Sequence, residues 1–260
     1  MEKQKIVVAN FKINLVLKFE IDNWIKGFLK HKQGINAMTT QIILAPPILN
    51  TLNFIKEAKD LKNVSVGLQD AFWEGKGSFT GGVSASTLKS YNGEYLILGH
   101  SERKKYFGET EEIVASKLQN AGRIGLKSIL CVGETAEEKN KEFTKQSLIR
   151  QLKIYLKNLS SGQLDRLLIC YEPVWAISAN NPVNPPTVDE IMTAKLIIRK
   201  FLVEQFGQKM IDKVKILYGG SVNQHNVEEI CWEAGMDGVL VGKASLVPTE
   251  LVGITKKIER

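Results

Sequence analysis

The sequence predicts one α/β domain over residues 1–260, folded as a single closed (β/α)8 barrel of eight parallel strands ringed by helices. Eight short β-prone runs recur along the chain, and each interval between them has room for one helix. The runs are apolar almost throughout, as expected of strands that are covered on both faces of a parallel sheet. A single barrel of this kind has about 250 residues, which matches the length of the chain.

No linker or low-complexity tract interrupts the predicted strands. They comprise residues 6–9, 41–45, 65–68, 95–98, 127–132, 167–171, 215–218 and 238–241. An open, doubly wound sheet is the competing architecture for alternating strands and helices. The pattern GxGxxG, which a dinucleotide-binding sheet places after its first strand, does not follow the first strand here. These features favour the closed barrel.

Helical signals lie in the segments between the predicted strands. Thr187 and Glu190 form a capping box, and the apolar residues that follow fall on one face of a helix. Thr110 can cap a second helix, for which Gly122 is the expected C-terminal glycine. A third helix is expected from about residue 223 to residue 235.

The composition is that of an ordinary globular protein, with 43% hydrophobic and 24% charged residues. The net charge is +7, but the basic residues are spread along the chain and no motif for binding RNA or DNA occurs. No apolar stretch approaches the roughly 20 residues of a membrane span, and the N-terminus does not resemble a signal peptide. We therefore expect a soluble, cytoplasmic protein with no nucleic-acid or membrane partner.

The three cysteines, Cys131, Cys170 and Cys231, form neither a CxxC pair nor a metal-ligand cluster. Two of them lie in apolar runs, so we expect buried free thiols in a reducing compartment. The sequence predicts no metal site.

A carboxylate follows the sixth predicted strand. Glu172 lies at the carboxyl end of this strand, where α/β barrels assemble their sites. Pro173 restricts the backbone after it, and Trp175 gives the next loop a bulky side chain. A firmly held base followed by a pivoting loop suits an enzyme that abstracts a proton and then excludes water.

Polar side chains also follow the first and fourth predicted strands. Asn10 and Lys12 are two residues apart, so both can face one pocket, where the lysine would stabilise an anion. A helix beginning at Ser101 would place the His100 imidazole at its amino terminus, where the helix dipole disfavours the imidazolium. We expect a neutral histidine that donates a hydrogen bond to a carbonyl oxygen. Each residue alone is more often structural, but together at strand ends they favour an active site.

Glycine-bearing turns follow the last two predicted strands. Residues 218–221 read Tyr-Gly-Gly-Ser, and residues 241–245 read Val-Gly-Lys-Ala-Ser. Glycines permit close backbone approach, and successive N–H groups at a helix start bind anions. Barrels commonly hold phosphate after strands seven and eight, so the two turns favour a phosphate site.

Together these motifs resemble the triosephosphate isomerase family, in order and along the whole chain. The matching blocks lie at residues 10–12, 79–81, 99–103, 107–110, 131–134, 171–176, 218–221 and 242–246. The resemblance implies a TIM barrel that interconverts dihydroxyacetone phosphate and D-glyceraldehyde 3-phosphate, an aldose–ketose isomerisation in glycolysis and gluconeogenesis. It implies no cofactor.

The resemblance also implies residue roles. Glu172 is the base that removes a proton beside the substrate carbonyl, and His100 is the electrophile. Lys12 and Asn10 contact the substrate, and Glu102 holds Lys12 in place. The phosphate would rest on backbone N–H groups of Ser178, Ser221, Gly242 and Lys243. Lys243 stands where the family commonly has a glycine, and its side chain either adds charge near the phosphate or points to solvent.

The loop after Glu172 departs from the family pattern. By resemblance it is the lid over the substrate, formed by Pro173, Val174, Trp175, Ala176, Ile177, Ser178, Ala179, Asn180, Asn181, Pro182 and Val183. Ser178 and Asn180 replace two typical glycines, and the segment is a few residues longer. We expect a lid that still closes, at altered rates.

The resemblance further implies a homodimer, in which Trp73, Phe79 and Thr80 contact the partner. Family members typically carry a glutamate after the Phe-Thr-Gly block, and this glutamate pairs with the arginine at the position of Arg103 in the other subunit. This chain has Gly82 there, so we expect one interfacial ion pair to be missing.

Two alternatives stay open. A different phosphate-binding barrel, such as an aldolase or synthase, is disfavoured because this sequence has no Schiff-base lysine signal or metal cluster at a strand end. A catalytically impaired barrel that acts as a binding or scaffold protein is disfavoured by the presence of Asn10, Lys12, His100 and Glu172. The altered lid is the feature that keeps this second alternative open.

Overall fold

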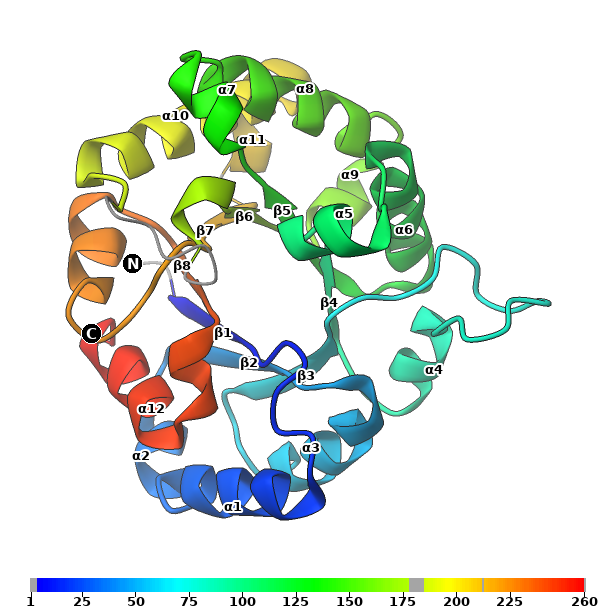
Figure 1. The fold of residues 1–260 in the computed structure, drawn as a ribbon, viewed down its shortest axis with the longest axis vertical. Coiled ribbons are helices and arrows are strands. Elements are labelled where there is room, and N and C mark those ends of the chain that lie inside the picture. The colour runs from blue at the N-terminus through cyan, green and yellow to red at the C-terminus, as the bar shows by residue number, and fades with distance from the viewer. Residues whose placement is uncertain (1–3, 178–184, 212, 260) are drawn as a thin grey trace.

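The computed structural model describes residues 4–177, 185–211 and 213–259, which form a closed barrel ringed by helices (Figure 1). The strands are β1 (Ile6–Asn10), β2 (Gln41–Ala45), β3 (Val64–Leu68), β4 (Tyr95–Leu98), β5 (Lys127–Val132), β6 (Leu167–Tyr171), β7 (Lys215–Tyr218) and β8 (Gly238–Val241). Each strand runs parallel to the next, and β8 pairs with β1 to close the barrel. The predicted architecture is confirmed.

All eight predicted strands are present, and two of them differ by one residue at an end. β1 extends to Asn10 because this residue still pairs with Ala45 of β2. β3 begins at Val64, which pairs with Ile42 of the same neighbour. The extension of β1 matters for the site, since it carries Asn10 to the rim of the barrel.

The core has two layers, because successive side chains of a strand point to opposite faces. The barrel interior is filled by a cluster of buried apolar residues from seven of the strands: Ile6, Val8, Ile43, Ala45, Tyr95, Ile97, Ile129, Cys131, Leu168, Cys170, Leu217 and Leu240. Ser65 of β3, which pairs with Ile43, is also buried. The alternate positions pack outward against the helices in a second, larger cluster. Burial of each large apolar side chain contributes about 1.5–3 kcal/mol, so both layers hold the strands in register.

Helices follow the strands and cover the outside of the barrel. They are α1 (Lys18–Leu29), α2 (Lys32–Ala37), α3 (Thr51–Ala58), α4 (Ala85–Ser90), α5 (Ser101–Phe107), α6 (Glu111–Ile124), α7 (Ala136–Asn140), α8 (Thr144–Leu156), α9 (Ser161–Leu164), α10 (Val188–Phe206), α11 (Gln208–Ile211) and α12 (Pro248–Lys257). Short 3₁₀ segments are η1 (Ile48–Asn50), η2 (Val174–Ala176) and η5 (Lys243–Leu246), and η4 (Glu229–Glu233) is π-helical.

The predicted helix starts at Thr110 and Thr187 are confirmed, and one predicted helix end is wrong. The helix expected from about residue 223 to residue 235 is shorter, with turns at 224–226 followed by the π-helical segment η4. The hydroxyl of Thr110 accepts a hydrogen bond from the Ile113 N–H, and Thr187 forms the capping box that begins α10. Gly122 does not end α6, which continues to Ile124 and stops at Gly125, where φ is 77°. A Cβ atom at Gly122 would lie 2.4 Å from the side chain of Gln163. The earlier glycine therefore serves close packing within the helix.

The three cysteines are free and buried, as predicted. Cys131 of β5 and Cys170 of β6 are register partners at the centre of the barrel. Within the described ranges, none of the helices combines the length and apolarity that crossing a bilayer requires.

Candidate active site

A cavity of about 320 Å³ opens where the first, fourth, sixth, seventh and eighth strands end. Seven predicted site residues line it: Asn10, Lys12, His100, Glu172, Ile177, Gly242 and Lys243. Gly219 and Gly220 belong to the turn predicted to hold phosphate, and the sequence analysis assigned no site role to the other lining residues, Asn14, Leu240 and Leu246. The parallel topology explains this convergence, because the carboxyl ends of all the strands meet at one rim.

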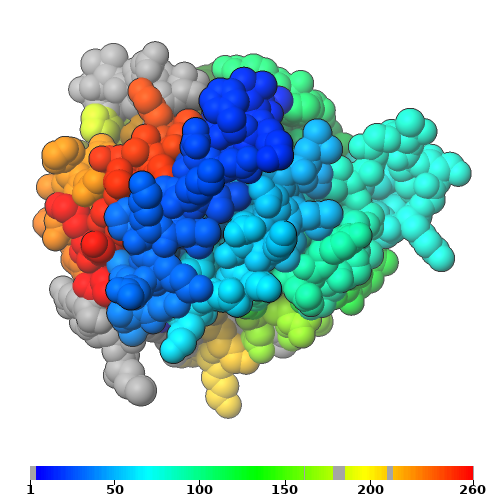
Figure 2. Space-filling model, turned by 90° about the horizontal axis from the view of Figure 1, so that it is seen from below, coloured from blue at the N-terminus to red at the C-terminus, as the bar shows by residue number. Residues whose placement is uncertain are grey.

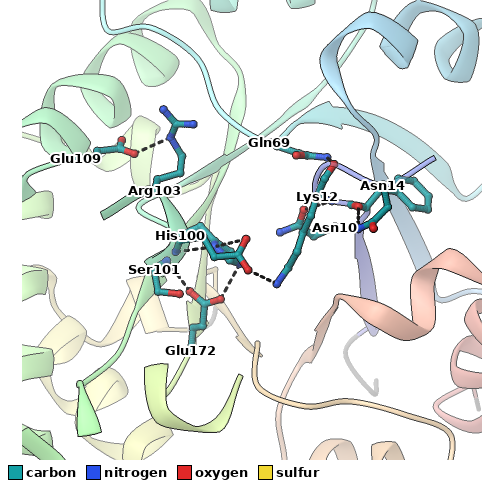
Figure 3. A network of polar contacts seen from close by, with 11 residues as sticks. Asn10, Lys12, Asn14, Gln69, His100, Ser101, Arg103, Glu109 and Glu172 are labelled. Atoms are coloured by element: carbon teal, nitrogen blue, oxygen red, sulfur yellow. Dashed lines mark hydrogen bonds and ion pairs between the residues drawn. The ribbon is translucent and has the colours of Figure 1, made fainter. Parts of the chain in front are cut away.

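Glu172 follows β6 directly and is almost fully buried. Its Oε2 accepts a hydrogen bond of 3.1 Å from the Ser101 N–H, and its Oε1 lies 2.8 Å from Nε2 of His100 (Figure 3). Burial raises the pKa of the Glu172 carboxyl, but His100, the Ser101 N–H and Lys12 outweigh burial, so the pKa lies below its usual value. In this resting arrangement, the carboxylate is held at the amino terminus of α5.

His100 is the N-cap residue of α5, which begins at Ser101 as predicted. Its Nδ1 accepts a hydrogen bond of 3.3 Å from the Glu102 N–H. A nitrogen that accepts an N–H carries no proton, so this bond places the imidazole proton on Nε2, facing Glu172. Burial lowers the pKa of His100, and the adjacent Glu172 carboxylate more than offsets this, so the pKa lies above its usual value. The amino terminus of α5 alone would instead lower the pKa of His100.

Lys12 lies on the opposite wall of the cavity, with its backbone in the left-handed region at φ 52°. Its N–H donates to Oδ1 of Asn10, and its Nζ lies 2.5 Å from Oε1 of Glu102. Gln69 Nε2 donates to the carbonyls of Lys12 and Ala45, at 2.8 and 2.9 Å. Positive φ is costly for a residue with a long side chain, so these bonds hold a strained backbone in place.

Lys12, Glu102, His100 and Glu172 thus form an open chain of charged and polar contacts, here called the catalytic chain (Figure 3). Glu102 links its two halves, since its carboxylate lies 2.5 Å from the Lys12 ammonium and its N–H donates to Nδ1 of the imidazole. The contact between Glu102 and Lys12 is the one that the family resemblance implies. The chain brings a base, an imidazole N–H and an ammonium to a single cavity.

Of the four residues predicted to bind phosphate, two line the cavity, one does not, and one lies outside the described residues. Gly242 and Lys243 line the cavity, and a Cβ atom at Gly242 would lie 3.6 Å from Cε of Lys12. Ser221 does not line the cavity, because its N–H and its hydroxyl both donate to the Ala176 carbonyl at 3.1 Å. Ser178 lies outside the described residues.

The predicted lid begins inside the described part of the chain and then leaves it. Pro173, Val174, Trp175, Ala176 and Ile177 are described, and the middle three form η2. The predicted lid residues from Ser178 to Val183, with Ala179, Asn180, Asn181 and Pro182 between them, lie outside the described residues.

Glu134 holds the first part of the predicted lid segment, and the sequence analysis did not assign it this role. Its carboxylate accepts hydrogen bonds from Trp175 Nε1 at 2.9 Å and from the Tyr171 hydroxyl at 3.1 Å. Glu134 is fully buried, and the ring of Trp175 also carries Nζ of Lys139 at 5.3 Å from its centroid. The available signal was its position as a carboxylate just past the fifth predicted strand.

The predicted dimer-contact residues lie on an arm, residues 72–83, that stands out from the body of the molecule between β3 and α4 (Figures 1 and 2). Phe72 stacks on Trp73 with ring centroids 3.9 Å apart and contacts Phe79 at 4.6 Å. Thr80, on the same arm, is exposed. The structure thus groups the aromatic residues at the arm and leaves Thr80 facing solvent.

No cluster of three or more His, Cys, Asp or Glu side chains arranged to hold a metal ion occurs in the part of the chain that the structure describes.

Comparisons with known proteins agree with this geometry. A sequence model of the family described as triosephosphate isomerase matches residues 5–258. Triosephosphate isomerase of Dictyoglomus thermophilum is 35% identical over 254 residues, covering 98% of this chain and 99% of the relative. That of Carboxydothermus hydrogenoformans is 41% identical over 202 residues, covering 78% and 79%. That of Chloroherpeton thalassium is 34% identical over 257 residues, covering 99% and 100%. The chain therefore belongs to the triosephosphate isomerase family of isomerase enzymes.

Proposed function

We propose that this enzyme interconverts dihydroxyacetone phosphate and D-glyceraldehyde 3-phosphate by proton transfer through an enediol. The observation that carries the proposal is the convergence of Glu172, His100 and Lys12 on one cavity of about 320 Å³. The proposed steps route each proton through side chains of this chain, with neither a cofactor nor a metal. The relatives named above support the choice of a triose phosphate as substrate.

The proposed reaction begins with Glu172 leaving its resting contacts. The carboxylate turns from the Ser101 N–H and His100 toward the substrate, and loss of these two partners raises its basicity while it stays desolvated. It then removes a proton from the hydroxymethyl carbon, and the electron pair of that C–H bond forms the C=C bond of the enediol. Return of the proton from Glu172 to the neighbouring carbon gives the aldehyde.

His100 acts on the oxygens in the proposed mechanism. Its Nε2 carries the proton, so it donates a hydrogen bond to the carbonyl oxygen as negative charge develops there. The same nitrogen passes a proton between the two oxygens of the enediol. Once Glu172 has turned away, burial and the amino terminus of α5 both favour the neutral imidazole that this role requires.

Lys12 supplies fixed positive charge opposite the base, and Asn10 contacts both its backbone and the cavity. An ammonium placed before the substrate arrives stabilises charge without reorganising during the reaction. Gln69 and Glu102 act as positioning residues, since they hold the Lys12 backbone and ammonium.

The phosphate group is proposed to bind backbone N–H groups at Gly242, Lys243, Ser221 and Ser178. The first two already line the cavity. Binding at Ser221 requires its contact with Ala176, a lid residue, to open, so phosphate binding and rearrangement of the lid are linked at this point. Closure of the lid over residues 173–183 remains a prediction.

We also propose that the chain is a single catalytic domain, that it acts in the cytoplasm, and that it forms a homodimer. The support for the dimer is apolar exposure beside the arm. Ile48 and Phe107 are 48% and 69% exposed, and they line one pocket together with Phe72 and Trp73 of the arm. Exposed apolar surface of this kind is typical of interfaces. In this dimer Thr80 would approach Asn10 and Lys12 of the partner, and light scattering at micromolar concentration should give twice the mass of 29.1 kDa.

Turnover of D-glyceraldehyde 3-phosphate by the wild type and by Glu172→Asp tests the proposed reaction. The shorter aspartate moves the base by about one bond length, which should lower kcat by about 10²-fold with substrate binding largely kept. Absence of turnover in the folded wild type would instead favour the binding or scaffold alternative. Circular dichroism of both proteins separates loss of chemistry from loss of fold.

A further inference from the structure

A glutamine side chain on the outside of the barrel binds the backbone beside the proposed base. Gln151 lies on α8 and is 3% exposed. Its Nε2 donates to the carbonyl of Gly133 at 2.8 Å, and its Oε1 accepts from the N–H of the same residue at 3.0 Å. Gly133 follows β5 directly and is itself buried. One side-chain amide therefore satisfies both backbone groups of a buried residue.

The strand register explains why Gly133 needs a side chain as its partner. β4 and β5 run in parallel with Leu98 opposite Leu130, and β4 ends at Leu98. Had β4 continued in this register, Ser101 would stand opposite Gly133, because each lies three residues further along its strand. Ser101 instead begins α5, and its N–H donates to the Glu172 carboxylate. The side-chain amide thus takes the place of a strand where β4 leaves the sheet.

Residues 132–134, here called the platform, bind the backbone on both sides of Glu172. The carbonyl of Val132 accepts a hydrogen bond of 2.8 Å from the Glu172 N–H. The carbonyl of Glu134 accepts one of 3.0 Å from the Val174 N–H. The residue that the glutamine holds is the middle one of the platform, so a shift there moves both carbonyls and the backbone that they bind.

The platform also lies in direct contact with the peptide of the base. A Cβ atom at Gly133 would overlap the carbonyl oxygen of Glu172, so only glycine fits at this position. The Glu134 carboxylate, which is fully buried, accepts a hydrogen bond of 2.9 Å from Nε1 of Trp175. The position of the platform therefore fixes the start of the predicted lid segment as well as the base.

We propose that Gln151 is a positioning residue: it holds the platform through Gly133 and thereby sets the place of the carboxylate that removes the proton. This inference rests on the reaction proposed above. Gln151 is not among the described residues that line the cavity, so it acts through Gly133 and not on the substrate. A displacement of about 1 Å, caused far from the reacting atoms, can lower a rate by about 10²-fold.

Gln151→Met tests the role, since it keeps a long unbranched side chain and removes both hydrogen bonds. The N–H and carbonyl of Gly133 lose their side-chain partner, so the variant should be less stable than the wild type. In the folded variant we expect kcat to fall about tenfold to 100-fold and KM to change less than about threefold. A purely structural glutamine would lower stability and leave this kinetic pattern unchanged.

Asp237→Leu is the matched control at the other end of the barrel. Asp237 immediately precedes β8, and its Oδ2 accepts a hydrogen bond of 2.8 Å from the Ile216 N–H. It is thus another largely buried side chain that binds strand backbone. The control should also lose stability, but its kcat should stay within about twofold of the wild type.

Gln151→Glu adds a readout that depends on pH. An ionised carboxylate accepts from the Gly133 N–H but cannot donate to the Gly133 carbonyl, whereas a protonated carboxyl can do both. Burial raises the pKa of a carboxyl, so the protonated form should be reached within the working range of the enzyme. The ratio of its kcat to that of the wild type should rise as the pH falls from about 9 to about 6, and Gln151→Met should show no such rise.

The experiment is steady-state turnover of D-glyceraldehyde 3-phosphate across this pH range, with urea unfolding to measure stability and to verify folding. No turnover in the folded wild type overturns the proposed reaction and this inference with it. An active wild type whose Gln151→Met variant keeps its kcat overturns the role of Gln151 and leaves the reaction standing. If Gln151→Met does not fold, Gln151→Glu decides: a kcat ratio that does not change with pH overturns the role.

Discussion

Two polar centres each include a residue of α5 and differ in how completely their charges are paired: the catalytic chain, and the closed group of Asp70, Arg103, Glu109 and Lys117, called the charge ring. In the ring, Asp70 and Glu109 each contact both cations, so the contacts close on themselves. When one ion pair of the ring is broken, each of its two groups keeps only one of its two partners, in a site that is largely removed from water.

The catalytic chain is open at both ends by comparison. Among the described residues, Glu172 has one backbone N–H and one imidazole as partners, and the ammonium of Lys12 contacts a single carboxylate. Groups paired this sparingly can exchange a resting partner for a substrate atom at small cost. Saturated pairing suits a structural role, and sparse pairing suits charges that must act on a ligand.

The largest expected effect comes from breaking the catalytic chain at Lys12. Lys12→Met keeps the length of the side chain and removes the charge, so kcat/KM should fall by about 10³-fold or more. The urea unfolding midpoint should barely move, because this ammonium is partly exposed. Steady-state kinetics and urea titration provide both numbers.

Lys18→Met is the matched control for this prediction, since Lys18 is an exposed lysine paired with Asp22. It should change kcat/KM less than twofold. Equal losses in the two variants would show that the charge of Lys12 is not used in the reaction.

Breaking the charge ring should show the reverse pattern. Glu109→Gln leaves Arg103 and Lys117 with one carboxylate between them in a buried site, which should cost about 3–5 kcal/mol of unfolding free energy. The kcat of the folded enzyme should change far less than in Lys12→Met. Urea unfolding measures the cost.

Glu137→Gln serves as the control, because it breaks an exposed pair with Lys141. Its unfolding midpoint should match that of the wild type. If Glu109→Gln lowered the unfolding midpoint no more than Glu137→Gln does, the contrast between the buried charge ring and an exposed ion pair would be contradicted.

The resting contact between Glu172 and His100 predicts a pH window of stability. The folded pKa of Glu172 is lowered, so its contribution is present above about pH 4.3 and is lost as the pH falls through the folded pKa. The folded pKa of His100 is raised, so its contribution is present below about pH 6.5 and is lost as the pH rises through the folded pKa. Both stabilising contributions are therefore present together between about pH 4.3 and about pH 6.5.

The stability difference between the wild type and Glu172→Gln should therefore be largest from about pH 4.3 to 6.5 and should shrink on both sides. Urea unfolding from pH 4 to 9 without ligand measures it. A difference that stays constant over this range would mean that the imidazole does not change its charge beside Glu172.

The smallest effect is expected at Lys243. Its ammonium is exposed at the rim of the cavity, so Lys243→Ala should raise KM for triose phosphate about twofold to fivefold at low ionic strength. The change should disappear at high salt. An unchanged KM at low salt would show that the side chain points to solvent.

The sequence predicted the strands and the rim residues because both depend on short-range patterns. An apolar run followed at once by Asn10, His100 or Glu172 defines a strand end without any knowledge of its neighbours. Parallel pairing then gathers the strand ends at one rim, so local patterns were sufficient to bring these three residues together.

The positioning contacts could not be predicted in the same way. Gln69 meets the carbonyl of Lys12 across 57 residues, and Trp175 meets Glu134 across 41. Nothing near Gln69 in the sequence marks it as a clamp on a strained backbone. The charge ring shares this property, since Asp70 and Lys117 are joined by a contact spanning 47 residues.

The helix end predicted at Gly122 failed for the opposite reason. The local sequence pattern was that of a helix end, but a contact with a residue distant in the sequence accounts for the glycine. A glycine after an apolar helical face is a typical helix end. The side chain of Gln163 occupies the space where a Cβ atom would lie, so the glycine is needed for contact and the helix passes through it.

The three buried thiols give the molecule an intrinsic probe of its own opening. Burial raises the pKa of Cys231 to about 12, and contact with Cys170, followed by burial, raises the pKa of Cys131 as well. Alkylating reagents react with the thiolate, so labelling in the native state should be nearly arrested until the barrel parts. The rate of iodoacetamide incorporation would then report the rate at which the native structure opens, with no dye or engineered tag.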